Sequence, residues 1–181
     1  MNNKNIGIFA VIILVIIILL PSLFRINSDI NSRTQPTEPI NSPTIQNQDI
    51  PNATAFINDY ANLLPQSTFL ELETTLKNFS ENGKGEIAIL TVKSMNGLNI
   101  DEFAIRVAEK WKVGKKGIDN GIIMIIAVSE RKVKIETGRG SSITDGQAGE
   151  ILDTYMVPLL KQNKWKEAII AGTNALIAKI N

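Results

Sequence analysis

The chain opens with a long run of apolar positions. No charged residue lies between Lys4 and Arg25, and residues 6–20 are almost wholly apolar. With residues 21–24 included, the run reaches the ~20 residues that a helix needs to span the hydrocarbon core of a bilayer. No convincing small-x-small cleavage signal follows it. We therefore expect residues 1–25 to be an N-terminal membrane anchor, with a cleaved signal sequence as the alternative.

The next segment, residues 26–52, has no periodic pattern. It is rich in Asn, Ser, Thr, Gln and Pro, and its isoleucines are isolated. Such a segment cannot bury enough apolar surface to offset the entropy that it would lose on ordering. We expect it to be a flexible polar linker.

In the remainder of the chain, helical and strand patterns alternate. Apolar side chains recur at helical spacing after Pro65 and again over residues 100–111. Residues 86–92 and 122–128 are apolar on both faces, which is typical of internal strands. Residues 133–137 alternate apolar and polar positions after the short turn SERK, which predicts an antiparallel hairpin with the preceding strand.

Two further helical patterns complete the chain, at residues 145–162 and 164–179, and Pro158 is expected to kink or end the first. The order β-α-β-α-β-β-α-α predicts an α/β fold. We expect a Rossmann-like α/β/α sandwich, with a mostly parallel sheet and an antiparallel edge hairpin, preceded by an N-terminal transmembrane helix. The folded domain should cover residues 53–181.

Composition narrows the chemistry that this domain can perform. The 181 residues include neither cysteine nor histidine. Thiolate and histidine zinc sites and Ser-His-Asp catalysis are therefore excluded. The formal net charge is only +1, which argues against a nucleic-acid-binding protein. Carboxylates, lysine, serine, backbone amides and a bound hard cation remain as the means of binding or catalysis.

The predicted hairpin brings several oxygen donors together. In an antiparallel pair the start of one strand lies beside the end of the other, so Asp119 and Asn120 should lie at the same end of the sheet as residues 138–145. That second segment contains hydroxyl side chains and ends with Asp145. Carboxylate, amide and hydroxyl oxygens suit Ca²⁺ or Mg²⁺ and not a soft metal. The sequence therefore predicts a candidate cation site here.

The same residues have a structural interpretation of about equal weight. Asp-Asn-Gly at positions 119–121 is ordinary turn chemistry, and Thr144 with Gln147 fits a helix capping box. A phosphate-binding loop has less support, because the pattern G-x-G-x-x-G requires glycine where the chain has Ile143.

A second acidic set consists of Asp59, Asp101 and Glu102. If the first strand runs parallel to the second, this set lies at the opposite end of the sheet from Asp119. Asp101 and Glu102 fit the first turn of a helix, where carboxylates are favourable. Asp59 follows a strand and has no evident structural role.

Several blocks of the folded part resemble the TPM domain family. These blocks are INDYANLLP, IAILTV, AEKWKVGKKGIDNGIIMIIAVSERKVKIETGRG, TDG and VPLLKQNKWKEAIIAG. The resemblance covers residues 53–179. It is most specific in W-x-x-G…D-N-G, followed by an apolar strand, R-x-V-x-I-E-x-G-x-G and T-D.

The resemblance implies a Rossmann-like domain outside the cytoplasm, with calcium binding in its loops and, in plant members, acid phosphatase activity. The positions that match the family's acidic motif are Asp59, Asp119 and Asp145, with Asn120 beside the second. These four residues are the expected metal ligands. Where the family usually has an aromatic residue and then Leu-Glu, this chain has Arg139 and Ser-Ser at positions 141–142, which leaves the ligand preference of the loop open.

We therefore expect a membrane-anchored, extracytoplasmic module that binds Ca²⁺, with Mg²⁺ as the alternative ion, and acts in protein assembly, maintenance or membrane-complex modulation. Its expected partners are the membrane, through the N-terminal helix, and a membrane or cell-envelope protein, but no nucleic acid. The alternative is a metal-dependent phosphatase acting on phosphomonoesters. The sequence contains no D-x-D motif and no recognisable activated serine, which favours the binding module.

Overall fold

The computed structural model describes residues 50–180. The expected membrane anchor at residues 1–25 and most of the expected linker lie outside the described residues. Between residues 50 and 180, no helix is both long enough and apolar enough to cross a membrane.

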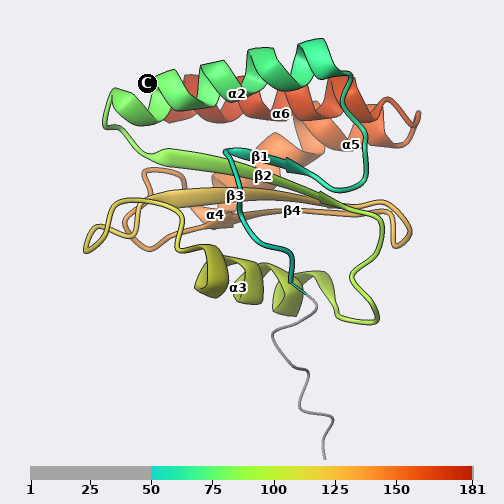
Figure 1. Ribbon diagram of the computed structural model, residues 1–181, viewed down its shortest axis with the longest axis horizontal. Helices are drawn as coiled ribbons and strands as arrows, with labels where there is room; N and C mark the ends of the chain where they lie inside the picture. Colours follow the sequence, from blue (N-terminus) through green and yellow to red (C-terminus); the bar gives the residue numbers. More distant parts are fainter. Residues whose placement is uncertain (1–49, 181) are drawn as a thin grey trace, which may run out of the picture. The chain divides into compact units, whose positions relative to one another are not determined.

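A four-stranded sheet forms the centre of the domain (Figure 1). β1, β2 and β3 are parallel, and β4 runs antiparallel to β3 at one edge. The predicted mostly parallel sheet with an antiparallel edge hairpin is therefore confirmed. β2 and β3 are almost fully buried, as their continuous apolar sequences predict. The strands lie side by side in chain order: β1 (Ile57–Asp59), β2 (Glu86–Val92), β3 (Gly121–Ala127) and β4 (Lys132–Thr137).

Helices cover both faces of this sheet (Figure 1). One apolar cluster joins α2 (Gln66–Glu81), α4 (Asp145–Ile151) and α6 (Trp165–Ile180) to one face of β2 and β3. A smaller cluster joins α3 (Ile100–Trp111) to the opposite face. The chain therefore has the three-layer arrangement that its alternating patterns predict.

The two crossover connections of the parallel strands have opposite hands. Both connections step in the same direction across the sheet, from β1 to β2 and from β2 to β3. Their helices, α2 and α3, nevertheless lie on opposite faces. Since two steps of the same hand would place both helices on one face, one connection must have the uncommon left-handed form. The order also lacks the reversal at which doubly wound sheets bind nucleotides.

The predicted helix at residues 145–162 is interrupted before its proline. α4 runs directly into a π-helical segment, η2 (Leu152–Met156), and then into the short α5 (Val157–Leu160). Pro158 has no N–H to donate to the preceding turn, and its ring would clash with a carbonyl four residues earlier in a regular helix. The wider π turn removes that conflict, and the helical segment continues past Pro158 as far as Leu160.

The folded part begins earlier than residue 53. Ile50 is only 2% exposed and packs into the α3 cluster. The next carbonyls are held by side chains: Lys110 Nζ donates to the Ile50 oxygen at 2.5 Å, and Trp111 Nε1 donates to the Pro51 oxygen at 2.8 Å. The Tyr60 hydroxyl donates to the Asn52 oxygen at 2.7 Å. Residues 50–52 therefore belong to the folded domain, on the side of the sheet that α3 covers, and are not part of the linker.

Candidate functional site

Two loops meet at the end of the sheet where β3 begins and β4 ends. The backbone N–H of Gly138 donates to the Gly121 oxygen at 2.8 Å, and that of Gly140 donates to the Asp119 oxygen at 2.9 Å. A Cβ atom on Gly138 would lie 2.1 Å from the Asp119 oxygen, and one on Gly140 would lie 1.8 Å from the Ile118 oxygen. The two glycines are therefore needed because the loops pack backbone against backbone.

Asp119 and Asp145 each form a hydrogen bond with a residue at or just after the end of β4. Asp119 Oδ2 accepts a hydrogen bond from the backbone N–H of Arg139 at 3.1 Å. Asp145 Oδ1 accepts one from the Thr137 hydroxyl at 3.0 Å. Both carboxylates are exposed, and each has its second oxygen outside these bonds. The predicted convergence of these two residues at one end of the sheet is confirmed.

Asn120 belongs to the same loops but has a structural role. Its side chain is buried, with 8% exposure, and its Oδ1 accepts a hydrogen bond from the backbone N–H of Lys115 at 2.9 Å. This bond closes the loop that connects α3 to β3. The amide oxygen that would bind a cation is already engaged.

The predicted capping box at the start of α4 is present. Thr144 accepts a hydrogen bond from the backbone N–H of Gln147, and the Gln147 side chain accepts one from the backbone of Thr144. The N-terminus of α4 is therefore stabilised by Thr144 and Gln147 without a bound ion.

Asp59 lies at the opposite end of the sheet, because it ends a strand that is parallel to β3. Its two oxygens accept hydrogen bonds from the backbone N–H groups of Leu63, at 3.0 Å, and Leu64, at 2.9 Å. The Thr91 hydroxyl also donates to Asp59 Oδ1. Asp59 therefore organises the turn before α2, a role that the sequence reading did not find, and it cannot share an ion with Asp119.

The other acidic residues of that end carry the helix charges that the sequence predicts. Asp101 and Glu102 lie in the first turn of α3. Lys134 Nζ lies 2.6 Å from Asp101 Oδ1, and Arg106 lies 2.6 Å from Glu102 Oε1.

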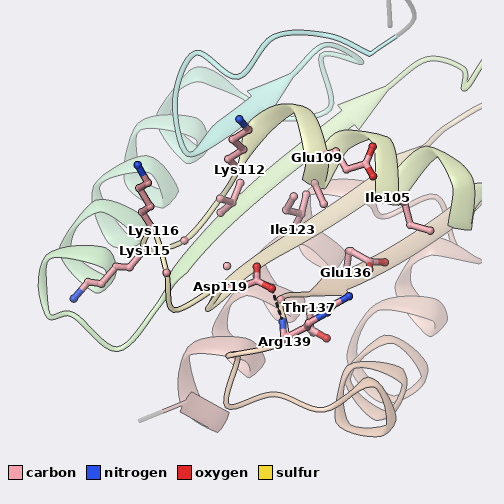
Figure 2. A pocket seen from close by; sticks show the side chains of 16 residues that line it. Ile105, Glu109, Lys112, Lys115, Lys116, Asp119, Ile123, Glu136, Thr137 and Arg139 are labelled. Carbon is pink, nitrogen blue, oxygen red and sulfur yellow. Dashed lines mark hydrogen bonds between the residues drawn. The ribbon is translucent and has the colours of Figure 1, made fainter. Parts of the chain in front are cut away.

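A cleft of ≈ 470 Å³ lies beside the paired loops, between them and the C-terminal end of α3 (Figure 2). Figure 2 shows the Asp119 side chain near its centre, joined to Arg139. Sequence reasoning did not find the contribution of Glu109 and Glu136, because these residues come from α3 and β4 and meet only through the fold. The charged residues that line the cleft are Glu109, Lys112, Lys115, Lys116, Asp119, Glu136 and Arg139.

Any cation at these loops would need ligands other than acidic side chains. Within residues 50–180, no group of three or more acidic side chains is arranged to hold a metal ion. Asp119 and Asp145 supply two carboxylates at this end, while Ser141 Oγ already accepts a hydrogen bond from the backbone N–H of Ile143 at 3.1 Å. Further ligands would have to be carbonyl oxygens or water. Such a set suits Ca²⁺, whose coordination geometry is flexible, better than Mg²⁺, which requires an octahedral arrangement.

Three solved structures of bacterial proteins are similar in fold to this chain. The N-terminal domain of a P. gingivalis protein, solved in solution, is 24% identical, with a TM-score of 0.65, and the match covers 74% of this chain and 87% of that one. The N-terminal domain of the cg2496 protein from Corynebacterium glutamicum is 16% identical, with a TM-score of 0.57, and the coverage is 71% and 81%. The BA42 protein of the psychrophilic Bizionia argentinensis is 18% identical, with a TM-score of 0.52, and the coverage is 65% and 81%.

No curated protein matches the chain significantly. The sequence does match a family model, the TPM domain, over residues 57–179. That range runs from the first residue of β1 almost to the end of α6 and includes both loops of the cleft. The chain therefore belongs to the TPM domain family.

Proposed function

We propose that this chain is a membrane-anchored TPM domain of the cell envelope that binds a hard divalent cation, Ca²⁺ in preference to Mg²⁺, and acts as a binding module in protein assembly or maintenance. One observation carries the proposal. Asp119 and Asp145, from two loops that are hydrogen-bonded to one another, present carboxylates at the same end of the sheet.

The chemistry of the cleft supports binding more than catalysis. The cation would be held by Asp119, which lines the cleft, and by Asp145 at the start of α4, which lies outside the cleft lining. Carbonyl oxygens and water would complete its shell, and the ion would join the loop after α3 to the loop after β4. Asn120 and Asp59 are assigned structural roles, because their oxygens accept bonds from backbone N–H groups. Among the described residues that line the cleft there is no serine to act as a nucleophile.

The location in the envelope rests on the sequence. The apolar run at residues 6–20, the polar segment after it and the lack of cysteine are compatible with an anchored domain outside the cytoplasm. The partner in this proposal is a membrane or envelope protein that docks at the cleft once the cation has fixed its two loops.

Calorimetric titration of residues 44–181 with Ca²⁺ and with Mg²⁺ tests the cation site. We expect measurable Ca²⁺ binding that weakens at least about tenfold in Asp119→Asn and in Asp145→Asn, since each variant removes a charged ligand. Asp153→Asn changes an exposed aspartate on η2 and is the matched control. Absence of heat and of thermal stabilisation with either ion would rule the proposal out.

A second candidate function is metal-dependent hydrolysis of a phosphomonoester. The observation in its favour is that Lys112 and Arg139 line the same cleft as Asp119, so that a phosphate group and a cation could be bound together. An aryl phosphate assay with the same proteins distinguishes the two. Turnover that requires the cation and disappears in Asp119→Asn would support the enzyme, and turnover unchanged by this substitution would come from a contaminant.

A further inference from the structure

The loop between α3 and β3 has an unusual combination of exposed side chains. Ile118 is 53% exposed, and Lys112, Lys115 and Lys116 of the same segment are also exposed. The loop turns sharply, with φ angles of 54° at Lys112, 103° at Gly114 and 86° at Gly117. Figure 1 shows it extending beyond the end of the sheet. We propose that this loop is a membrane-docking element: Ile118 inserts into the interface of an anionic bilayer while the three lysines bind lipid phosphates.

The lysines are available for this interaction. None of the three takes part in an ion pair within residues 50–180. Lys115 Nζ makes one long hydrogen bond, 3.4 Å, to the Gly83 oxygen, which an exposed side chain can exchange for a lipid phosphate. Figure 2 shows Lys112 and Lys116 projecting to one side of the loop and Lys115 to another, with all three amino groups away from the carboxylates of Glu109 and Asp119. The positive charge of this loop is therefore directed at solvent.

A structural explanation covers only part of the pattern. A lysine at the end of α3 compensates the negative end of the helix dipole, and that effect falls off within one turn. It accounts for Lys112, the C-terminal cap of α3. It does not account for Lys115 and Lys116, which lie beyond the helix, or for the exposure of Ile118.

The shape and chemistry of the loop favour a lipid surface over a protein partner. A loop that exposes one apolar side chain and several lysines can place the apolar group below the headgroups and the ammonium groups among the phosphates. An acidic protein surface would use the lysines but would leave Ile118 without an apolar environment. The whole chain carries a formal charge of only +1, so the attraction is local and short-ranged.

The test uses residues 44–181, without the apolar N-terminus. This fragment contains both apolar clusters, and the matching N-terminal domains of two relatives were solved alone in solution. Partitioning is measured on phosphatidylcholine vesicles with and without phosphatidylglycerol, in the presence of a chelator, so the result does not depend on the cation proposal. We expect binding only to the anionic vesicles, decreasing as salt is raised.

Two sets of variants identify the loop. Lys115→Gln with Lys116→Gln should lower the partition coefficient about 25-fold, at about fivefold for each lysine. The control is Lys161→Gln with Lys164→Gln, two exposed lysines that are in no ion pair within the described residues. Ile118→Ser should lower the coefficient about fivefold, whereas Leu70→Ser, at a side chain that is 55% exposed on α2, should leave it unchanged.

The outcomes are decisive in both directions. Equal binding to neutral and anionic vesicles, or an equal loss in the lysine control pair, would overturn the assignment to this loop. An unchanged coefficient in Ile118→Ser would show attraction without insertion and would overturn the proposed docking mode. Unchanged thermal unfolding of the four variants shows that lost binding does not come from lost folding.

Discussion

At the scale of single residues, the cleft depends on glycines that admit no side chain. Gly140 lies so close to the Ile118 oxygen that a Cβ atom would be 1.8 Å away. Gly140→Ala should therefore push the two loops apart and lower the free energy of unfolding by about 2 kcal/mol, measured by urea denaturation. Gly149→Ala is the control, since a Cβ there meets nothing within 4 Å and alanine favours a helix. It should raise stability, so a loss of equal size in both variants would contradict this account.

Glu130 provides a residue-scale test of pH dependence. Its Oε1 accepts hydrogen bonds from Ser94 Oγ at 2.6 Å and from the backbone N–H of Met95 at 2.9 Å, which join the β3–β4 turn to the loop after β2. The Ser94 bond is the main cause that holds the pKa of Glu130 below its ordinary value of 4.5, while burial opposes it. A lowered pKa means that the stabilisation is complete above the unfolded-state pKa and is lost as the pH falls through the folded-state pKa.

We expect Glu130→Gln to cost about 1 kcal/mol of unfolding free energy at neutral pH. Urea denaturation at a series of pH values should show this difference shrinking only below about pH 4.5, the ordinary value for the group. Ser94→Ala should show the same pH dependence, because it removes the main cause of the shift. A difference that stayed constant down to pH 3 would contradict the assignment.

The residue scale also shows where sequence reasoning stops. The position of Asp119 and Asp145 at one end of the sheet could be predicted, because a hairpin fixes which strand ends are neighbours. The role of Asp59 could not, since it depends on Thr91, which lies 32 positions away, as well as on two nearby backbone N–H groups. The sequence does not distinguish a carboxylate that binds a metal after a strand from one that accepts hydrogen bonds from the backbone of a turn.

At the scale of elements, the short edge strand β1 is protected by a helix. Glu73 of α2 accepts hydrogen bonds from the backbone N–H groups of Phe56 at 3.1 Å and Ile57 at 2.8 Å. These groups would otherwise lack partners at an edge, where unpaired backbone invites association with another chain. Glu73→Leu should therefore cost about 2 kcal/mol and promote aggregation, measured by urea denaturation and light scattering. Glu71→Leu, an exposed position on the same helix, should do neither.

The periodicity of apolar positions predicted which segments are helices and which are strands. It did not predict where a helix is interrupted. The helices after Pro65 and at residues 100–111, and both long strands, were predicted to within one or two residues, because their apolar patterns are set by burial of one face or two. The π-helical segment before Pro158 leaves no mark in such a pattern, since it changes the hydrogen-bond ring by a single residue. The cleft was also not predictable, because its lining combines a helix, two loops and two strands.

At the scale of the whole molecule, residues 50–52 help to cover one face of the sheet, although their sequence is typical of a linker. Ile50 belongs to the same buried cluster as residues of α3 and as Leu90 and Val92 of β2, so the covering of that face is not made by α3 alone. A lone isoleucine in a polar stretch has no periodic partners, so only the assembled core reveals that it is buried. The donors of Lys110 and Trp111 then fix this segment at the end of α3 that borders the cleft.

This arrangement predicts that the domain boundary affects stability. Ile50→Ser in residues 44–181 should lower the free energy of unfolding by about 2 kcal/mol, because a nearly fully buried side chain is lost. A fragment that starts at residue 53 should lose at least as much, since it also lacks the carbonyls that Lys110 and Trp111 bind. Ile118→Ser is the control, because that isoleucine is 53% exposed. Equal stability of the two fragments would mean that residues 50–52 are not part of the folded domain.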